Sequence, residues 1–259
     1  MSGINLLLVD ALNLIRRVYA AQSGEDDPEK VAGALSGSVQ SLQRALRECR
    51  PTHVACVFDS EEHGWRHELY ADYKAGRAPM PEALRLRLGD FKEAFLKLGV
   101  PSLMFSRYEA DDIIATLAVK VSLRNGNVVI LSTDKIFSQL LSDHIKIRDH
   151  FQRRDLDRSY IIEKYHVHPE QIVDFFALTG DSTNNIPGVP TVGPKTASKL
   201  LNEFKNLDQV LLEAANIKGS LGKTLSMQVG SAGMSQKLMR LKCDIVLGMN
   251  MRSLRYIPD

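Results

Sequence analysis

Short apolar runs alternate with longer helical patterns over the first two thirds of the chain. The runs cover residues 4–9, 53–58, 101–105 and 127–132, with a less regular one at 145–148, and their length and apolar content predict strands. Between them, residues 31–49, 81–98 and 109–123 repeat apolar side chains every three or four positions, as amphipathic helices do. This alternation predicts an α/β fold with a mostly parallel sheet and flanking helices.

The strand patterns stop near residue 169, and helix and turn signals follow. We therefore expect a catalytic-type α/β domain over residues 1–168 and a helical region over residues 169–259.

Composition narrows the class of protein. Hydrophobic residues make up 44% of the 259 positions and charged residues 25%, which excludes a disordered or membrane-spanning chain. The net charge of +2 excludes a polycation that coats nucleic acid through total charge. Residues 183–259 nevertheless carry ten Lys and Arg against five Asp and Glu. A more acidic N-terminal part and a basic C-terminal part suit a protein that holds cations in one place and phosphates in another.

Cysteine usage bears on the compartment. The three cysteines form no CxxC pair, and the N-terminal apolar run lacks the basic start of a signal peptide. We expect a cytoplasmic protein without a membrane anchor.

Three aspartates directly follow predicted strands. Asp10 follows residues 4–9, Asp59 follows residues 54–58, and Asp134 follows residues 128–133. The carboxyl ends of parallel strands share one edge of a sheet, where ligands bind, so these side chains should converge. Each one alone could merely cap a helix or begin a turn, but three carboxylates brought close repel one another unless a cation lies between them.

A further acidic cluster opens the helical pattern at 109–123. It contains Glu109, Asp111 and Asp112, more acids than capping requires, and Glu109 and Asp112 can share a helix face. Carboxylates without nearby His or Cys ligands suit magnesium or manganese better than zinc.

Basic and aromatic residues follow Asp59 in a segment that could form a lid or arch. Arg66, Lys74 and Arg77 could stabilise the charge of a phosphodiester, and Trp65 or Tyr73 could stack on a base. A solvated loop with incidental charge is the alternative.

A glycine- and proline-rich stretch covers residues 180–197. Gly188 and Gly193 allow tight backbone geometry, and Pro194 suits the first position of a helix. The free N–H groups at such a helix start can bind phosphate without reading bases. An ordinary proline-rich loop explains this ordered pattern less well.

Together these motifs resemble the bacterial 5′-nuclease and flap-endonuclease family, and the resemblance covers nearly the whole chain. It is carried by Asp10, Phe58-Asp59, Tyr73-Lys74-x-x-Arg77, Glu109-Ala-Asp-Asp112, Ser132-Thr-Asp-Lys135 and Gly180-Asp181 through Ala197. The sequence lacks a polymerase domain and so is most similar to the stand-alone branch of that family.

The resemblance implies a PIN-like catalytic domain with a helical arch, followed by a helix–hairpin–helix that binds duplex DNA. It implies structure-selective cleavage of 5′ single-stranded flaps at DNA junctions by metal-dependent hydrolysis, with Mg²⁺, or Mn²⁺ in its place, and no organic cofactor. The implied metal-site residues are Asp10, Asp59, Glu109, Asp111, Asp112, Asp134 and Asp181, and the implied phosphate contacts are Lys74 and Arg77, supported by Tyr73 and Arg66. It also implies K⁺ held by carbonyls around Leu178, Thr179, Pro187, Val189 and Val192, and DNA contacts from Thr191, Val192, Gly193, Pro194, Lys195 and Thr196.

Two positions depart from the family's second metal site, which draws on four acids. Ile136 stands where one acid is expected and Asn184 where another is. An apolar side chain cannot ligate, and an amide offers a dipole rather than a charge. We therefore expect one firmly held metal ion and a second that is absent, water-bridged or recruited with DNA.

Other functions stay open at this stage. A DNA-junction-binding module with little or no cleavage would also fit an incomplete second site, and a PIN-like ribonuclease would fit the acid cluster. A nucleotide-binding dehydrogenase is disfavoured because no GxGxxG follows the first strand.

Overall fold

The computed structural model describes residues 3–258 and is built around a six-stranded sheet in the order β3-β2-β1-β4-β5-β6. The strands are β1 (Asn5–Asp10), β2 (His53–Val57), β3 (Ser102–Leu103), β4 (Asn127–Leu131), β5 (Ile145–Asp149) and β6 (Arg154–Asp155). The first five pair in parallel, which confirms the predicted sheet. The short antiparallel β6 was not predicted.

Helices cover both faces of the sheet because successive apolar side chains of a strand point to opposite faces, so both faces are apolar. Leu6 and Leu8 of β1 join the core under α6 (Ala110–Ser122). Leu7 and Val9 point the other way, into the core formed with α1 (Ala11–Ala21), α2 (Pro28–Cys49) and α5 (Leu88–Lys97). A strand buried on both faces reads as a continuous apolar run, as residues 4–9 do.

Two helical predictions differ from the structure. The pattern at 81–98 forms two helices, α4 (Glu82–Leu86) and α5, which separate at Arg87, where the backbone leaves helical geometry just before Gly89. Helix α1 was not predicted because it follows β1 without a loop. Asp10 both ends the strand and caps the helix by accepting from the Asn13 backbone N–H.

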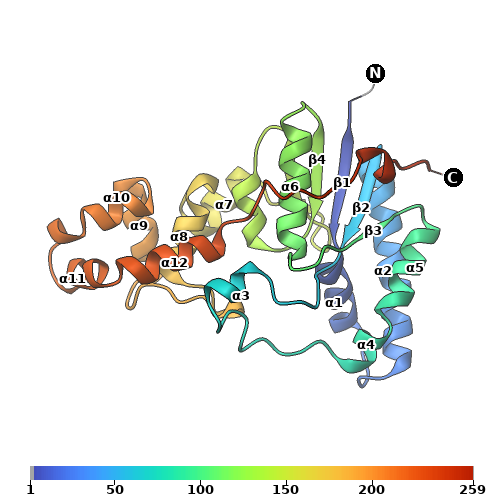
Figure 1. Cartoon of the computed structure of the whole chain (residues 1–259), viewed down its shortest axis with the longest axis horizontal. Helices are drawn as coiled ribbons and strands as arrows, with labels where there is room; N and C mark the ends of the chain where they lie inside the picture. The colour runs from blue at the N-terminus through green and yellow to red at the C-terminus, as the bar shows by residue number, and fades with distance from the viewer. Residues whose placement is uncertain (1–2, 259) are drawn as a thin grey trace.

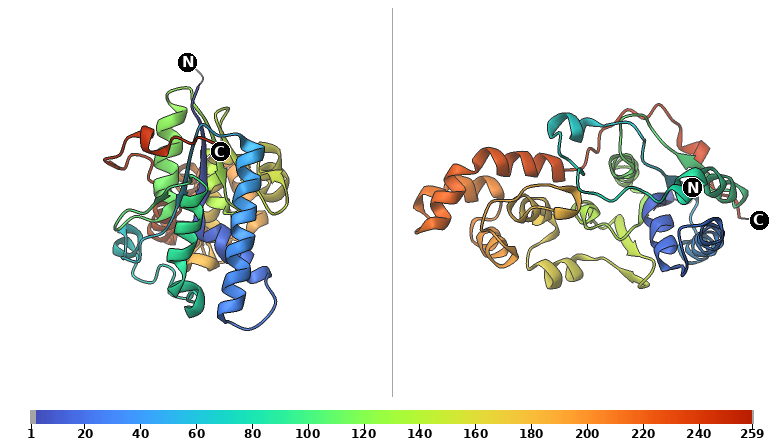
Figure 2. Two further views of the ribbon diagram at one scale, coloured as in Figure 1. Left: turned by 90° about the vertical axis from the view of Figure 1, so that its right-hand side faces the viewer. Right: turned by 90° about the horizontal axis from the view of Figure 1, so that it is seen from below.

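The helical region lies at the other end of the long axis of the molecule, as Figures 1 and 2 show. Its helices are α8 (Ile172–Thr179), α9 (Pro194–Phe204), α10 (Leu207–Leu212), α11 (Ser220–Met227) and α12 (Val229–Met239), and α7 (Arg158–Tyr165) precedes them at the end of the α/β domain. The hydrophobic core under α6 continues into this region without a break, through Phe176, Leu201 and Leu238.

The chain after α12 returns to the sheet, and Figure 1 shows it crossing back towards β2. Thr116 and Lys120 of α6 donate to the carbonyls of Lys242 and Ile245 in this returning segment. Near its end, the Tyr256 backbone N–H donates to the Thr52 carbonyl beside β2. The segment thereby ties the helical region to the α/β domain. In residues 3–258 we find no helix whose length and apolar character would let it span a bilayer.

Candidate active site

Four aspartates line one cavity at the carboxyl ends of the strands. Asp10 ends β1, Asp59 and Asp134 follow β2 and β4, and Asp111 lies in the first turn of α6. The cavity has a volume of about 190 Å³. The structure thus brings together side chains that lie up to 124 positions apart in the sequence.

Burial and repulsion by neighbouring acids raise the pKa values of Asp10, Asp111 and Asp134. The pKa of Asp10 rises to about 7, first because the group is buried and then because Asp59 and Asp134 repel its charge. Burial, followed by the charges of Asp134, Asp10 and Asp59, raises the pKa of Asp111 well above its ordinary value. Burial also raises the pKa of Asp134. Such a cluster favours a bound cation, because a cation relieves both the repulsion and the loss of hydration.

Hydrogen bonds set the direction of three of the four carboxylates. Asp10 accepts from the Ser132 hydroxyl at 2.9 Å, Asp59 from the Ala110 backbone N–H at 2.7 Å, and Asp134 from the Ile136 N–H at 2.9 Å. The bond from Asp59 to the start of α6 links the second strand to the helix that carries Asp111.

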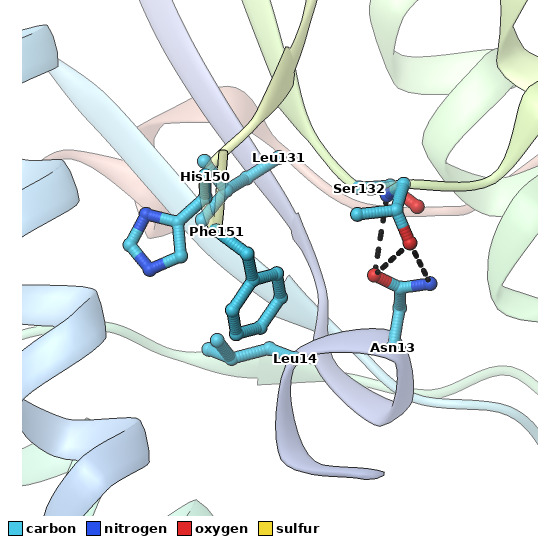
Figure 3. A pocket seen from close by; sticks show the side chains of 7 residues that line it. Asn13, Leu14, Leu131, Ser132, His150 and Phe151 are labelled. Atoms are coloured by element: carbon cyan, nitrogen blue, oxygen red, sulfur yellow. Dashed lines mark hydrogen bonds between the residues drawn. The ribbon is translucent and has the colours of Figure 1, made fainter. Parts of the chain in front are cut away.

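Asn13 holds the loop after β4 beside α1. Its side chain bonds with the hydroxyl and the backbone N–H of Thr133, and Figure 3 shows its amide facing that loop, with Leu14 and Phe151 beside it. This joins the loop that carries Asp134 to the helix that Asp10 caps. Asn13 and Ser132 were not predicted as site residues, although Ser132 begins one of the family motifs; the sign that could have identified both is that they lie close in sequence to strand-end aspartates.

The donor set suits a hard divalent ion held mainly through water. In the described part of the chain, no three His, Cys, Asp or Glu side chains are arranged so that they could hold a metal ion directly. Mg²⁺ usually keeps several waters and binds through one or two carboxylates, so the four aspartates of this cavity, with room for water between them, fit it.

Cationic side chains face the aspartates across the same cavity. Lys74 and Arg77 line it, as predicted, and so do Arg16 and Arg17 of α1, which the sequence analysis did not select as site residues. The Lys74 ammonium pairs with Glu109 at 2.5 Å. Although burial works against its charge, the acids Glu109, Asp59 and Asp111 raise the pKa of Lys74, so the side chain stays charged.

The backbone at Lys74 is constrained. Its φ of 60° is a left-handed conformation, which few residues other than glycine adopt. The Lys74 N–H donates to the Asn184 carbonyl, and the Asn185 side chain donates to the Asp72 carbonyl. The loop before the hairpin therefore holds the segment that carries Lys74 in place.

Glu109 and Asp112, which we expected among the metal ligands, do not line the cavity. Asp112 is fully buried and accepts from Arg66 through both oxygens, from the Trp65 indole and from the Lys242 N–H. Glu109 accepts from Arg66, Lys74 and Tyr73, and the charges of Lys74 and Arg66 outweigh burial and hold its pKa below the usual range. Both carboxylates serve as counterions of the arch segment, residues 60–81.

Arg66 and Tyr73 also differ from expectation. Arg66 is 1% exposed. Its guanidinium donates hydrogen bonds to Glu109 and Asp112 and to the carbonyls of Leu238 and Arg240. Tyr73 is 4% exposed, and its hydroxyl donates to Glu109. Neither side chain can contact a phosphate or stack on a base in this structure. The arch is helical only at α3 (Trp65–Leu69), and turns complete it.

Asp181 lies outside the cavity and already has a cationic partner. It is buried, pairs with the Lys135 ammonium at 2.8 Å and accepts from the Asn184 side chain at 2.8 Å. Asn184 therefore binds the carboxylate rather than adding a charge.

The glycine-rich stretch forms a tight turn before α9. A side chain at Gly188 would place its Cβ 2.5 Å from the Gly180 nitrogen. The backbone at Gly188 can therefore approach the backbone at Gly180 only because residue 188 is glycine. Helix α9 begins at Pro194 after Gly193, as predicted, and no side chain caps it. Thr191, Gly193, Pro194 and Lys195 are exposed and Thr196 is half-buried, whereas the Val192 side chain is buried and only its backbone can face a ligand.

Several carbonyls proposed for potassium already accept hydrogen bonds. The Leu178 carbonyl accepts from the Val189 N–H, the Val189 carbonyl from the Val192 N–H, and the Pro187 carbonyl from the Ser235 hydroxyl. A carbonyl oxygen has two lone pairs, so one accepted bond leaves a second lone pair for an ion.

Two family models match the two parts of the chain. The model described as 5′-3′ exonuclease, N-terminal resolvase-like domain, matches residues 5–166, and the model described as 5′-3′ exonuclease, C-terminal SAM fold, matches residues 167–259.

Curated relatives match over nearly the full length. Proteins named flap endonuclease Xni are 45% identical in Tolumonas auensis and 42% identical in Photobacterium profundum, each over 98% of both chains.

Solved structures share the fold. Bacteriophage T5 5′-exonuclease with bound zinc gives a TM-score of 0.76 at 24% identity, covering 92% of this chain and 90% of that one. The catalytic core of Rad2 in complex with DNA gives 0.59 at 13% identity, covering 99% and 83%.

A strand-end acid site on a resolvase-like domain, joined to a helical SAM-fold region, defines a metal-dependent nuclease. The chain belongs to the 5′-3′ exonuclease family. Relatives named flap endonuclease Xni match it over nearly their whole length.

Proposed function

We propose that this chain is a structure-selective endonuclease that cleaves 5′ single-stranded flaps at DNA junctions. The observation that carries the proposal is the cavity in which Asp10, Asp59, Asp111 and Asp134 face Lys74 and Arg77. A cavity that combines carboxylates for a divalent ion with cations for a phosphate suits phosphodiester hydrolysis. The names of the curated relatives support the same substrate.

Asp111, with Asp10, Asp59 and Asp134, would hold Mg²⁺ or Mn²⁺, in part through water. When bound, the ion supplies an activated water and a positive charge beside the scissile phosphodiester. Lys74 and Arg77 bind the phosphate oxygens and stabilise the charge that grows there as the water adds to phosphorus and the P–O bond of the leaving strand breaks. Glu109, itself held by Tyr73 and Arg66, directs the Lys74 ammonium.

The hairpin and the start of α9 would hold the duplex backbone. Thr191, Gly193 and Lys195 are exposed there, and the uncapped N–H groups of the helix can bind phosphate without reading sequence. We propose K⁺ on the carbonyls of Leu178, Thr179, Pro187, Val189 and Val192, which would brace the turn. We also propose a cytoplasmic location, on the cysteine usage alone.

A flap assay tests the function. A labelled 5′-flap duplex incubated with Mg²⁺ should yield a short product cut near the junction, and excess EDTA should abolish it. Binding of the flap without product in Mg²⁺ or Mn²⁺ would favour a junction-binding module instead. Faster cleavage of the same flap made of RNA would favour a ribonuclease.

We further propose that Lys135 takes the place of a second metal ion. Its ammonium forms an ion pair with Asp181. Both groups act on Asp134: the charge of Lys135 lowers the pKa of Asp134, and the charge of Asp181 raises it. The ammonium also lies 4.7 Å from the centre of the Phe176 ring, which fixes its position.

Titration of the free protein with Mn²⁺, followed by calorimetry, should therefore show one firm site. Lys135→Gln should add a second, weaker site, because Asp134 and Asp181 would then face each other without a cation. The double variant Lys135→Gln/Asp181→Asn should return to one site. Two tight sites on the unmodified protein, with Asp134 and Asp181 as direct ligands, would contradict the proposal.

A further inference from the structure

Arg16 lines the acidic cavity without an ionic partner. It lies on α1, is half-buried and lines the cavity together with Arg77. Its Nε atom is completely buried and makes no hydrogen bond. Lys74 forms an ion pair with Glu109, but within residues 3–258 neither Arg16 nor Arg77 takes part in an ion pair with a carboxylate.

The two guanidiniums are close enough to repel. Burial lowers the pKa of Arg16, the charge of Arg77 lowers it further, and Asp59 offsets only part of this. Two like charges held beside one cavity, one of them with a buried donor left unused, form a site that an anion would complete.

The neighbouring Arg17 serves as a contrast. Its guanidinium donates to the Thr133 hydroxyl and lies 5.0 Å from the centre of the Phe151 ring. The Arg17 guanidinium thus already has partners within the protein, whereas the Arg16 Nε atom makes no hydrogen bond.

The position of Arg16 indicates which anion it would take. Its backbone lies six residues beyond Asp10, about 9 Å farther along the axis of α1, and its side chain reaches the cavity from that helix, where Asp59 influences it. Lys74, by contrast, lowers the pKa values of Asp111 and Asp134 and so lies beside the acids. An anion held by Arg16 would therefore enter the cavity from the side of α1, next to the phosphate that Lys74 and Arg77 bind.

We propose that Arg16 binds the phosphate adjacent to the scissile one, which Lys74 and Arg77 hold, and so sets which phosphodiester reaches the carboxylates. The proposal rests on the function proposed above, since it takes the ligand to be a DNA strand. It makes Arg16 a binding residue that sets the register of cleavage.

Binding without cleavage tests this directly. The affinity of a fluorescent 5′-flap duplex would be measured by anisotropy in EDTA over a series of KCl concentrations, for the unmodified protein, Arg16→Gln, Arg16→Lys and the control Arg85→Gln. Arg85 is an exposed arginine on α4 that does not line the cavity. Arg16→Gln should weaken binding about tenfold and lower the slope of log K against log salt by about 1, as loss of one phosphate contact does. Arg16→Lys should keep the slope, because the charge remains, and Arg85→Gln should change neither quantity.

Product length in Mg²⁺ gives a second readout. Arg16→Gln should spread the cut over neighbouring phosphodiesters, whereas the unmodified protein should cut at one. Unchanged affinity and slope, or an equal loss in Arg85→Gln, would overturn the proposal. If the unmodified protein does not cleave but the change in slope persists, the function proposed above fails while the phosphate contact stands.

Discussion

Asp111→Asn is expected to lower the rate of flap cleavage about 10³-fold or more while leaving the fold intact. Asp111 lines the cavity and lies at the start of α6, and its charge is opposed by burial and by Asp134, Asp10 and Asp59. The amide has nearly the same shape but offers a divalent ion no charge, so the ion and the water it activates would be lost. Single-turnover cleavage of the labelled flap in saturating Mg²⁺ measures the effect.

The same substitution should not weaken the free protein. Removing a charge that three neighbouring carboxylates repel should keep or raise the melting temperature in EDTA. This separates loss of catalysis from loss of structure. The control is Asp143→Asn, because Asp143 is exposed and lines a cavity with Asn5 and Asn127 at the opposite ends of the strands. Near-normal cleavage by Asp111→Asn, or equal inactivation of Asp143→Asn, would remove the basis for this active site.

Arg66→Met is expected to lower the free energy of unfolding by about 3–5 kcal/mol. The substitution leaves Asp112, which is fully buried, as an uncompensated charge and also frees the carbonyls of Leu238 and Arg240. The arch, α6 and the returning C-terminal segment meet at this guanidinium, so all three should loosen together. Urea unfolding followed by the fluorescence of Trp65 measures it well, because this single tryptophan donates to Asp112.

A second variant separates the buried charge from lost packing. Arg66→Met/Asp112→Asn should recover at least about 1 kcal/mol relative to Arg66→Met, because no unpaired charge then remains buried. Arg107→Met, which breaks only the exposed pair with Glu68, should change stability by less than about 1 kcal/mol. If the double variant is no more stable than Arg66→Met, the buried charge is not the cause.

Much of the fold could be predicted from the sequence because strands and helices have different periods. The five parallel strands and α2 and α6 lie within a few residues of their predicted places. Helix α1 was missed because its apolar positions continue the run of β1 with no turn between them. Strand β6 has only two residues, Arg154 and Asp155, and both are exposed, so no apolar pattern marks it.

The partners of the acid cluster at 109–112 could not be predicted from the sequence. We expected Glu109 and Asp112 to share a helix face, and they do, since both accept from the same Arg66 nitrogen. The sequence could not show that this face meets an arginine from the arch. Asp111 points about 100° away around the helix and lines the cavity instead.

By itself, the sequence determined that Asp10, Asp59 and Asp134 would meet at one edge of a parallel sheet, because strand ends share an edge whatever lies around them. Only the tertiary structure decided which acids line the cavity without a cationic partner in an ion pair and which are paired with a cation of the chain itself. That choice depends on cations brought from far away in the chain: Arg66 for Asp112, Lys74 for Glu109 and Lys135 for Asp181. A side chain's charge is local, but the field it experiences is set by everything folded around it.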